Sequence, residues 1–289
     1  MENARGATLM VLAMLGFALE DMLIKLLGDA VSVGQMLFML GCGGALAFGG
    51  IVRAQRDALF SRDMLTIPIF LRAVGEMVGT VCFVSAIVLT DLSSASAILQ
   101  ATPLLVTLGA ALFLGETVGW RRWSAITMGL IGVLLIIRPG FDSFEVLSLL
   151  AVGGALCLCL RDLATRSVPS SISTMQLSFL GFVVVIPAGG ALLLVTGTPL
   201  EALSGQSWLI FAMALTVGLF AYYGVVSAMR VGEISFVTPF RYSRLLFALI
   251  LGVTVFGETP DGLTLIGAAV IVGSGVYMVL RERQLRQTA

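Results

Sequence analysis

The chain has 289 residues, of which 58% are hydrophobic and 12% are charged, with 17 lysines and arginines balanced by 17 acids. A soluble domain carries roughly 25% charged residues, so this apolar excess is expected only in a protein that lies in lipid. The net charge is zero, and no basic tract is long enough to bind nucleic acid. The absence of histidine, with four cysteines inside apolar runs, predicts no metal site, cofactor or disulfide framework.

Apolar stretches of about 20 residues, the length that spans a bilayer, follow one another along the chain with short connections. We predict ten of them, at residues 6–27, 33–52, 66–89, 92–114, 121–138, 147–167, 173–196, 207–229, 234–256 and 263–280. The first contains no small-residue cleavage site, so it is interpreted as a membrane helix and not as a signal peptide. The predicted fold class is an all-α polytopic membrane protein with ten transmembrane helices.

Basic residues gather on the side of the membrane that holds the N-terminus. They are Arg5, Arg53, Arg56, Arg62, Arg121, Arg122, Arg166, Arg230, Arg281, Arg283 and Arg286. The connections on the other side carry mainly acids, such as Asp91, Glu201 and Asp261. Because positive residues favour the cytoplasmic side, we predict a multi-pass protein of the bacterial inner (plasma) membrane with both termini in the cytoplasm.

The two halves of the sequence match at a nearly constant offset. A shift of 141 or 142 places Asp21 on Asp162, Lys25 on Arg166, Gln35 on Gln176, Ser93 on Ser235, and Gly115-Glu116-Thr117 on Gly257-Glu258-Thr259. We predict two five-helix repeats, residues 1–143 and 144–289, in one transport domain. Five is odd, so the second repeat is inverted, an architecture typical of carriers. Glu116 and Glu258 each follow a glycine at a span end and are interpreted as turn residues.

Charged residues inside the spans are costly in lipid and mark candidate functional positions. Three acid–base pairs have the i, i+4 spacing of one helix face: Asp21 with Lys25, Arg72 with Glu76, and Asp162 with Arg166. We expect the first and third pairs, with Glu20 and Arg161, to act in gating or coupling; the alternative is that they anchor helix ends. Glu76 lies about 15 Å into its span, which favours a cavity wall over a structural ion pair.

The segment from Thr238 to Arg244 is the strongest candidate for substrate binding. Arg241 and Arg244 share a helix face at depths of about 11 and 15 Å, and neither has an acid three or four residues away. Glu20 or Glu76 from other helices, or a substrate carboxylate or phosphate, would balance them, and guanidinium groups suit such planar anions. We therefore predict an anionic or zwitterionic substrate, with a structural charge network as the alternative.

Residues at similar depth complete the predicted substrate site. Pro103 and Pro239 interrupt spans that are repeat mates, and such breaks are tolerated where backbone lines a cavity. The predicted substrate-binding set is Arg241, Arg244, Tyr242, Glu76, Arg72, Gln100, Tyr222 and Phe240. For the aromatic members the alternative is ordinary packing or anchoring at the membrane interface.

Two matched signatures end the fourth and ninth spans. They run from Pro103 through Ala111-Leu112-Phe113-Leu114-Gly115-Glu116 and from Phe247 through Val255-Phe256-Gly257-Glu258. With the five-helix duplication and residues 16–21 and 239–244, they make the chain resemble the ten-helix EamA-type members of the drug/metabolite transporter superfamily. The resemblance implies a central cavity lined mainly by helices 1, 3, 4, 6, 8 and 9. Some relatives carry riboflavin or S-adenosylmethionine, so a vitamin or cofactor carrier is one alternative.

The predicted function is secondary transport of a small organic metabolite by alternating access. A membrane-embedded enzyme and a channel are the competing classes, but the sequence holds neither a nucleophile elbow nor a zinc-protease motif, and no enzyme activity is predicted. No phosphate-binding loop of the ATPase type is present, so ATP does not drive transport directly. Proton coupling through Glu20 or Glu76, exchange and facilitated diffusion are open alternatives, as are the direction of transport and the oligomeric state.

Overall fold

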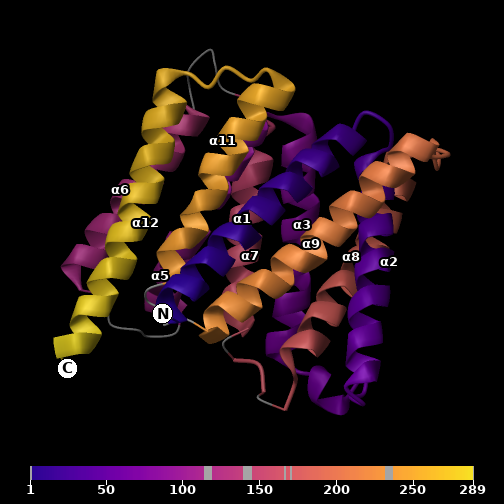
Figure 1. The fold of residues 1–289 in the computed structure, drawn as a ribbon, viewed down its shortest axis with the longest axis horizontal. Helices are drawn as coiled ribbons and strands as arrows, with labels where there is room; N and C mark the ends of the chain where they lie inside the picture. Colours follow the sequence, from indigo (N-terminus) through magenta and orange to yellow (C-terminus); the bar gives the residue numbers. More distant parts are fainter. Residues whose placement is uncertain are drawn as a thin grey trace.

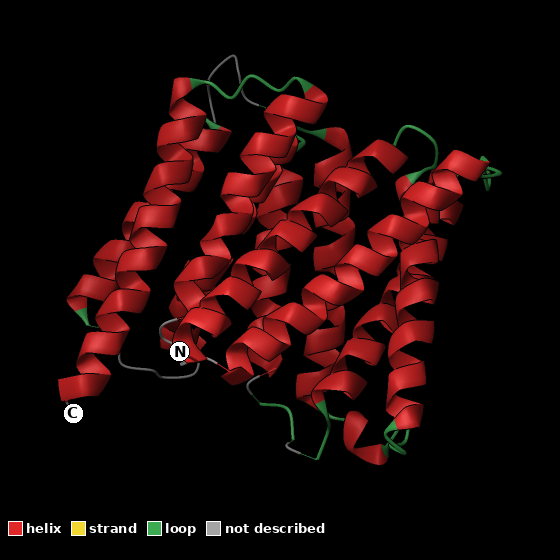
Figure 2. Cartoon of the chain, in the orientation of Figure 1, coloured by secondary structure: helices red, strands yellow, loops and turns green. Residues whose placement is uncertain are grey.

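The described part of the chain is helical, with short connections. The structure, a computed structural model, describes residues 2–113, 119–138, 145–165, 167–169, 171–231 and 237–288, and none of these lies in a strand (Figure 2). The helices are α1 (Glu2–Leu27), α2 (Val33–Ala54), η1 (Arg62–Met64), α3 (Ile67–Leu89), α4 (Leu92–Leu99), α5 (Thr102–Phe113), α6 (Trp120–Ile137), α7 (Ser148–Thr165), α8 (Thr174–Thr196), α9 (Gly205–Val231), η2 (Thr238–Tyr242), α11 (Ser243–Phe256) and α12 (Gly262–Thr288). The predicted all-α class is confirmed for these residues.

Seven helical segments among the described residues are long and apolar enough to cross a bilayer. Two shorter apolar helices, Trp123–Ile137 and Gly262–Tyr277, fall on the predicted fifth and tenth spans. The predicted ninth span corresponds to η2 followed by α11. The chain is therefore a multi-pass membrane protein.

Each main helix pairing joins the first half of the chain to the second. Helix α1 packs along α9, α2 along α8, α3 along α7, and α6 along α12. The α6–α12 pair stands at one side of the bundle and the α2–α8 pair at the other, with α1, α3, α7, α9 and α11 between them (Figure 1). Helix α1 begins and α12 ends at the same end of the bundle (Figure 1).

Both predicted proline breaks are confirmed. Pro103 has no N–H to donate to the carbonyl of Leu99, and the helix stops there; the Thr102 hydroxyl donates to that carbonyl instead, at 2.6 Å. Pro239 lies in the first turn of the short 3₁₀ helix η2, from which α11 continues. Each break therefore interrupts regular backbone in the middle of the bundle.

Glycines bring α3 close to α7. A Cβ atom on Gly75 would lie 2.7 Å from the carbonyl oxygen of Cys157, and one on Gly79 would lie 2.9 Å from Leu158 Cγ. Nothing larger than hydrogen fits at either position. Because α3 and α7 approach this closely, the charged residues that flank these glycines come within reach of one another.

Two matched glutamines tie α2 and α8 to the other half of the chain. The Gln35 amide donates to the carbonyl of Glu201 at 2.7 Å and accepts from the Glu201 N–H at 2.8 Å. The Gln176 amide donates to the carbonyl of Ala58 at 2.7 Å. Thus the start of each helix holds the loop that follows the other.

Candidate functional site

Asp21 on α1 binds Arg244 on α11. Arg244 Nη2 donates to both carboxylate oxygens, at 2.6 and 2.9 Å, and Nε donates to Oδ2 at 3.1 Å. The guanidinium carbon also lies 5.2 Å from the ring centre of Phe17 and 5.6 Å from that of Phe83. The expected Asp21–Lys25 pair is wrong, because packing of α11 on α1 offers Asp21 a bidentate partner that helix spacing alone does not.

Lys25 pairs instead with Glu258, a residue interpreted from sequence as part of a turn. Lys25 Nζ lies 3.3 Å from Glu258 Oε1 and also donates to the carbonyl of Thr90. The same carboxylate accepts from the backbone N–H groups of Leu92, at 2.6 Å, and Ser93, at 3.0 Å, and from the Ser93 hydroxyl at 2.6 Å. The turn interpretation was therefore incomplete; its signal was the Gly-Glu-Thr match between the halves.

A second charged cluster joins α3 to α7. Arg72 Nη2 lies 3.6 Å from Glu76 Oε2, so the predicted pair is present. Arg161 lies 3.1 Å from Glu76 and 2.9 Å from its neighbour Asp162. Arg166, the expected partner of Asp162, lies outside the described residues, as do Glu116 and Ser235, the repeat mates of Glu258 and Ser93.

Hydrogen-bond donors in this second cluster are incompletely used. Arg72 is 8% exposed, and its Nε and Nη1 atoms are buried without a hydrogen-bond partner among the described residues. Buried guanidinium donors are expected to be satisfied. Arg72 therefore has capacity to bind a ligand or water.

Arg241 and Glu20 form no ion pair with any other described residue. Arg241 is exposed and lies on η2, which packs against α1 and α12. Glu20 is half-buried, and its carboxylate lies against Gly218 of α9, where a Cβ atom would come within 2.3 Å of Oε1.

The polar and aromatic candidates take different places. The Gln100 amide donates to the backbone carbonyl of Arg241 at 3.1 Å, which joins the two helix breaks. Tyr242 is 5% exposed and points to Gly275 of α12, with a buried hydroxyl that has no described partner. The Tyr222 hydroxyl accepts from Ser178 of α8, and Phe240 is 37% exposed.

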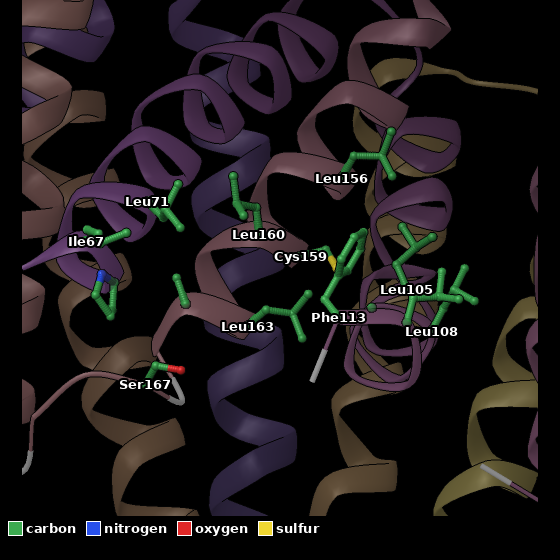
Figure 3. A pocket seen from close by; sticks show the side chains of 14 residues that line it. Ile67, Leu71, Leu105, Leu108, Phe113, Leu156, Cys159, Leu160, Leu163 and Ser167 are labelled. Atoms are coloured by element: carbon green, nitrogen blue, oxygen red, sulfur yellow. The ribbon is translucent and has the colours of Figure 1, made fainter. Parts of the chain in front are cut away.

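An apolar cavity of about 500 Å³ lies apart from these charges, between α3, α5 and α7 (Figure 3). Its wall includes Leu71 on α3, Leu108 on α5 and Leu160 on α7. Leu71 and Leu160 are the sequence neighbours of Arg72 and Arg161. Helices α3 and α7 therefore present an apolar face to the cavity, while their charged residues meet one another. None of the residues predicted from the sequence to bind substrate lines this cavity.

Comparison with known proteins gives a consistent picture. The sequence profile of the EamA-like transporter family matches residues 4–138 and again residues 147–281. A riboflavin transporter of Vibrio cholerae is 32% identical over 187 residues, which are 64% of this chain and 62% of that protein, so the match spans less than two thirds of that relative. An S-adenosylmethionine uptake transporter of Rickettsia conorii is 22% identical over 71% of this chain and 69% of its own length.

The fold also matches a solved structure. A crystal structure with 19% sequence identity superposes with a TM-score of 0.59 and covers 95% of this chain and 98% of its own. At this identity the likeness concerns the fold alone. The relatives named above are described as transporters.

Proposed function

Because this chain belongs to the EamA-like transporter family, we propose that it is a secondary transporter that moves a small organic metabolite across the bacterial inner membrane. Its named relatives are transporters, and we assign this chain to the same class and not to the enzymes. The observation that carries the proposal is that two clusters of charged residues, one joining α1 to α11 and one joining α3 to α7, lie inside a bundle of membrane-spanning helices. Ionisable residues at such depth are typical of transport pathways.

The proposed architecture is ten transmembrane helices in two inverted five-helix repeats, residues 1–143 and 144–289. Three observations support it. The family profile matches once in each half. Each main helix pairing joins a helix of one half to a helix of the other. Gln35 and Gln176 make equivalent hydrogen bonds to the opposite half. Inverted repeats suit alternating access, and cytoplasmic termini follow from the positive-inside bias.

The substrate site proposed here centres on Arg72, Arg241 and Glu20, with Glu76 and Gln100 beside them. Arg244 is assigned a structural role and not a substrate contact, because its guanidinium group already contacts Asp21 and two phenylalanine rings. The interior bases of the described residues equal the interior acids in number: they are Lys25, Arg72, Arg161, Arg241 and Arg244, against Glu20, Asp21, Glu76, Asp162 and Glu258. This balance favours a zwitterionic or polar uncharged substrate over a simple anion.

Glu20 is the better of the two candidates for proton coupling. Glu76 lies within 4 Å of two guanidinium groups, those of Arg72 and Arg161. Glu20 has no described ion-pair partner. Glu20 can take up a proton without breaking an ion pair, so Glu20 suits that role, and the paired Glu76 suits substrate positioning.

The named relatives favour nitrogen-rich heterocyclic substrates, such as riboflavin and S-adenosylmethionine, as the first to be tested. A ligand that binds only the folded protein raises its stability by about 2.7 kcal/mol at 100 times Kd. Purified protein should therefore be screened for thermal stabilisation against these compounds and a wider metabolite set, and hits tested for flux into liposomes with and without a pH gradient.

The expected result is stabilisation by at least one compound, saturable flux of that compound, and loss of both in the Arg241→Gln variant. The Trp208→Phe variant is the control. Trp208 is a half-exposed aromatic residue near the start of α9 and belongs to neither of the two charged clusters. A hit that is bound and carried equally well by the Arg241→Gln and Arg72→Gln variants would refute the proposed site. Failure of every compound to cross the liposome membrane would refute the proposed function.

A further inference from the structure

Three segments that are distant in sequence meet at the end of the bundle where α1 ends and α4 begins. They are the last turn of α1 at Lys25, the connection from α3 to α4 at Thr90 to Ser93, and the connection from α11 to α12 at Glu258. Under the proposed topology this is the outer side of the membrane. The Glu258 side chain is 4% exposed, and that of Lys25 is 15% exposed.

Glu258 satisfies the N-terminus of α4 although it is 166 residues away from Leu92. The residue that precedes α4, Asp91, is of a type that usually caps a helix, but its side chain makes no capping bond here. The Glu258 carboxylate takes both the Leu92 and Ser93 N–H groups instead. Without it, these donors would lose their partners in a buried place, because Leu92 and Ser93 are at most 2% exposed.

Lys25 completes the link. Its ammonium group lies 3.3 Å from Glu258, donates to the Thr90 carbonyl and lies 5.1 Å from the ring centre of Phe256 on α11. Lys25 and α4 belong to the first half of the chain, and Glu258 belongs to the second. Any motion that separates the halves at this end must therefore break the Lys25–Glu258 pair and the bonds from Glu258 to α4.

We propose that Lys25 and Glu258, with the first turn of α4, form the outer gate of this transporter, closed in the present structure and broken when the site opens to the outside. This inference rests on the proposed function and assigns Glu258 as a gating residue of the same pathway. The gate depends on an acceptor at this position, because only an acceptor can bind the two N–H groups of α4, and Glu258 supplies it from the second half of the chain.

Asp261 supplies a matched control in the same connection. It also forms an ion pair, with Arg138, and also accepts from a helix N-terminus, at the N–H of Thr264. This pair joins α6 to α12 at the side of the bundle and is 49% exposed at Asp261. Its loss changes the same charge and the same kind of helix cap without touching the proposed gate.

The test is hydrogen–deuterium exchange of the full-length protein in lipid nanodiscs, which does not depend on knowing the substrate. In the Glu258→Gln and Lys25→Met variants we expect exchange in residues 22–27 and 92–99 to rise about tenfold, the factor expected when charge-assisted hydrogen bonds are lost. The Asp261→Asn variant should leave both segments unchanged. Exchange in α2 and α8 should stay at the wild-type level in all three.

Three outcomes would overturn the gate. They are unchanged exchange in both Glu258→Gln and Lys25→Met, an equal rise in Asp261→Asn, or a rise spread over all helices, which would make Glu258 a general stability residue. The charge-swapped double variant, Lys25→Glu with Glu258→Lys, should also show raised exchange in residues 22–27 and 92–99, because lysine cannot accept from the α4 N–H groups. Exchange at the wild-type level in this variant would contradict the role of the helix N-terminus. Liposome flux is scored separately, so an absent flux tests the proposed function and leaves the exchange result to decide the gate.

Discussion

The two charged regions of the interior solve the same burial problem differently. Between α1 and α11, one acid meets one base: Asp21 binds Arg244 through two carboxylate oxygens, and two aromatic rings cover the guanidinium group. Between α3 and α7, Glu76 is shared by Arg72 and Arg161, and two buried nitrogen atoms of Arg72 have no described partner. The first region is complete and the second is not.

This difference suggests that the two regions have different roles, one in holding the helices together and the other in binding a ligand. A saturated buried pair contributes little to recognition, because its hydrogen bonds must be broken before a substrate can replace them. The unsatisfied donors of Arg72 and the accessible guanidinium group of Arg241 gain from any ligand that supplies acceptors. The α3–α7 region and Arg241 are therefore where a substrate is expected, and the α1–α11 pair is where the helices are held.

The largest effect should come from breaking the complete pair. Asp21→Asn leaves Arg244 buried without its counter-ion, and removal of one partner from a buried pair costs about 3–5 kcal/mol. We expect a strongly lowered unfolding temperature in detergent. The double variant Asp21→Asn with Arg244→Gln should recover most of this loss; a single variant as stable as the wild type would contradict the role of the pair.

A change in the incomplete region should lower affinity rather than stability. Arg241 is accessible and unpaired among the described residues, so Arg241→Gln should weaken binding of a stabilising ligand about tenfold or more, the loss expected for a hydrogen bond to a charged group. Its unfolding temperature without ligand should change little. Arg244→Gln should show the reverse pattern; equal effects of the two variants on stability would remove the distinction.

Two glycines, Gly218 and Gly181, allow Glu20 and Glu76 to be compared as candidates for proton coupling. A Cβ atom on Gly218 would lie 2.3 Å from Glu20 Oε1, whereas one on Gly181 would lie 3.4 Å from Glu76 Oε2. Gly218→Ala must displace the end of the flexible Glu20 side chain, which should cost little stability but should alter the pH dependence of flux. Gly181→Ala makes an ordinary contact and serves as the control; identical pH profiles for both variants would argue against coupling at Glu20.

The smallest effect is expected at the exposed ion pair. Hydrogen bonds from Arg138 and from Thr264 hold the pKa of Asp261 well below its usual range. A carboxyl with a lowered pKa stabilises the folded state above its unfolded pKa, and this contribution is lost as the pH falls through the folded value. Asp261→Asn should therefore lower the unfolding temperature at neutral pH by only about 2 °C, and less in acid; a larger loss at low pH would reverse the expected sign.

The pKa of Asp91, in the connection from α3 to α4, is shifted in the opposite direction to that of Asp261. Burial raises the pKa of Asp91, and Glu258 adds to the rise while Lys25 opposes it. Asp91 therefore takes up a proton at a higher pH than an isolated aspartate. Glu258, by contrast, contacts Lys25 and accepts from two helix N–H groups, and these contacts assign it, not Asp91, to the proposed gate.

The sequence by itself determined the membrane class, the helix breaks and the positions of the interior charges. Hydrophobic length, proline chemistry and the offset between the halves are local properties, so Pro103 and Pro239 were located correctly without knowledge of packing. Helical spacing also predicted the Arg72–Glu76 pair, because both residues lie on one turn of one helix.

Only the tertiary structure decided which charges meet. Spacing of i, i+4 places Asp21 and Lys25 on one helix face, but their partners come from 223 and 233 residues away, at Arg244 and Glu258. A bidentate guanidinium group and a helix N-terminus bind a carboxylate more strongly than a neighbouring lysine does. Which of these lies within reach depends on how α11 packs on α1 and α4, and a single sequence does not encode that distance locally.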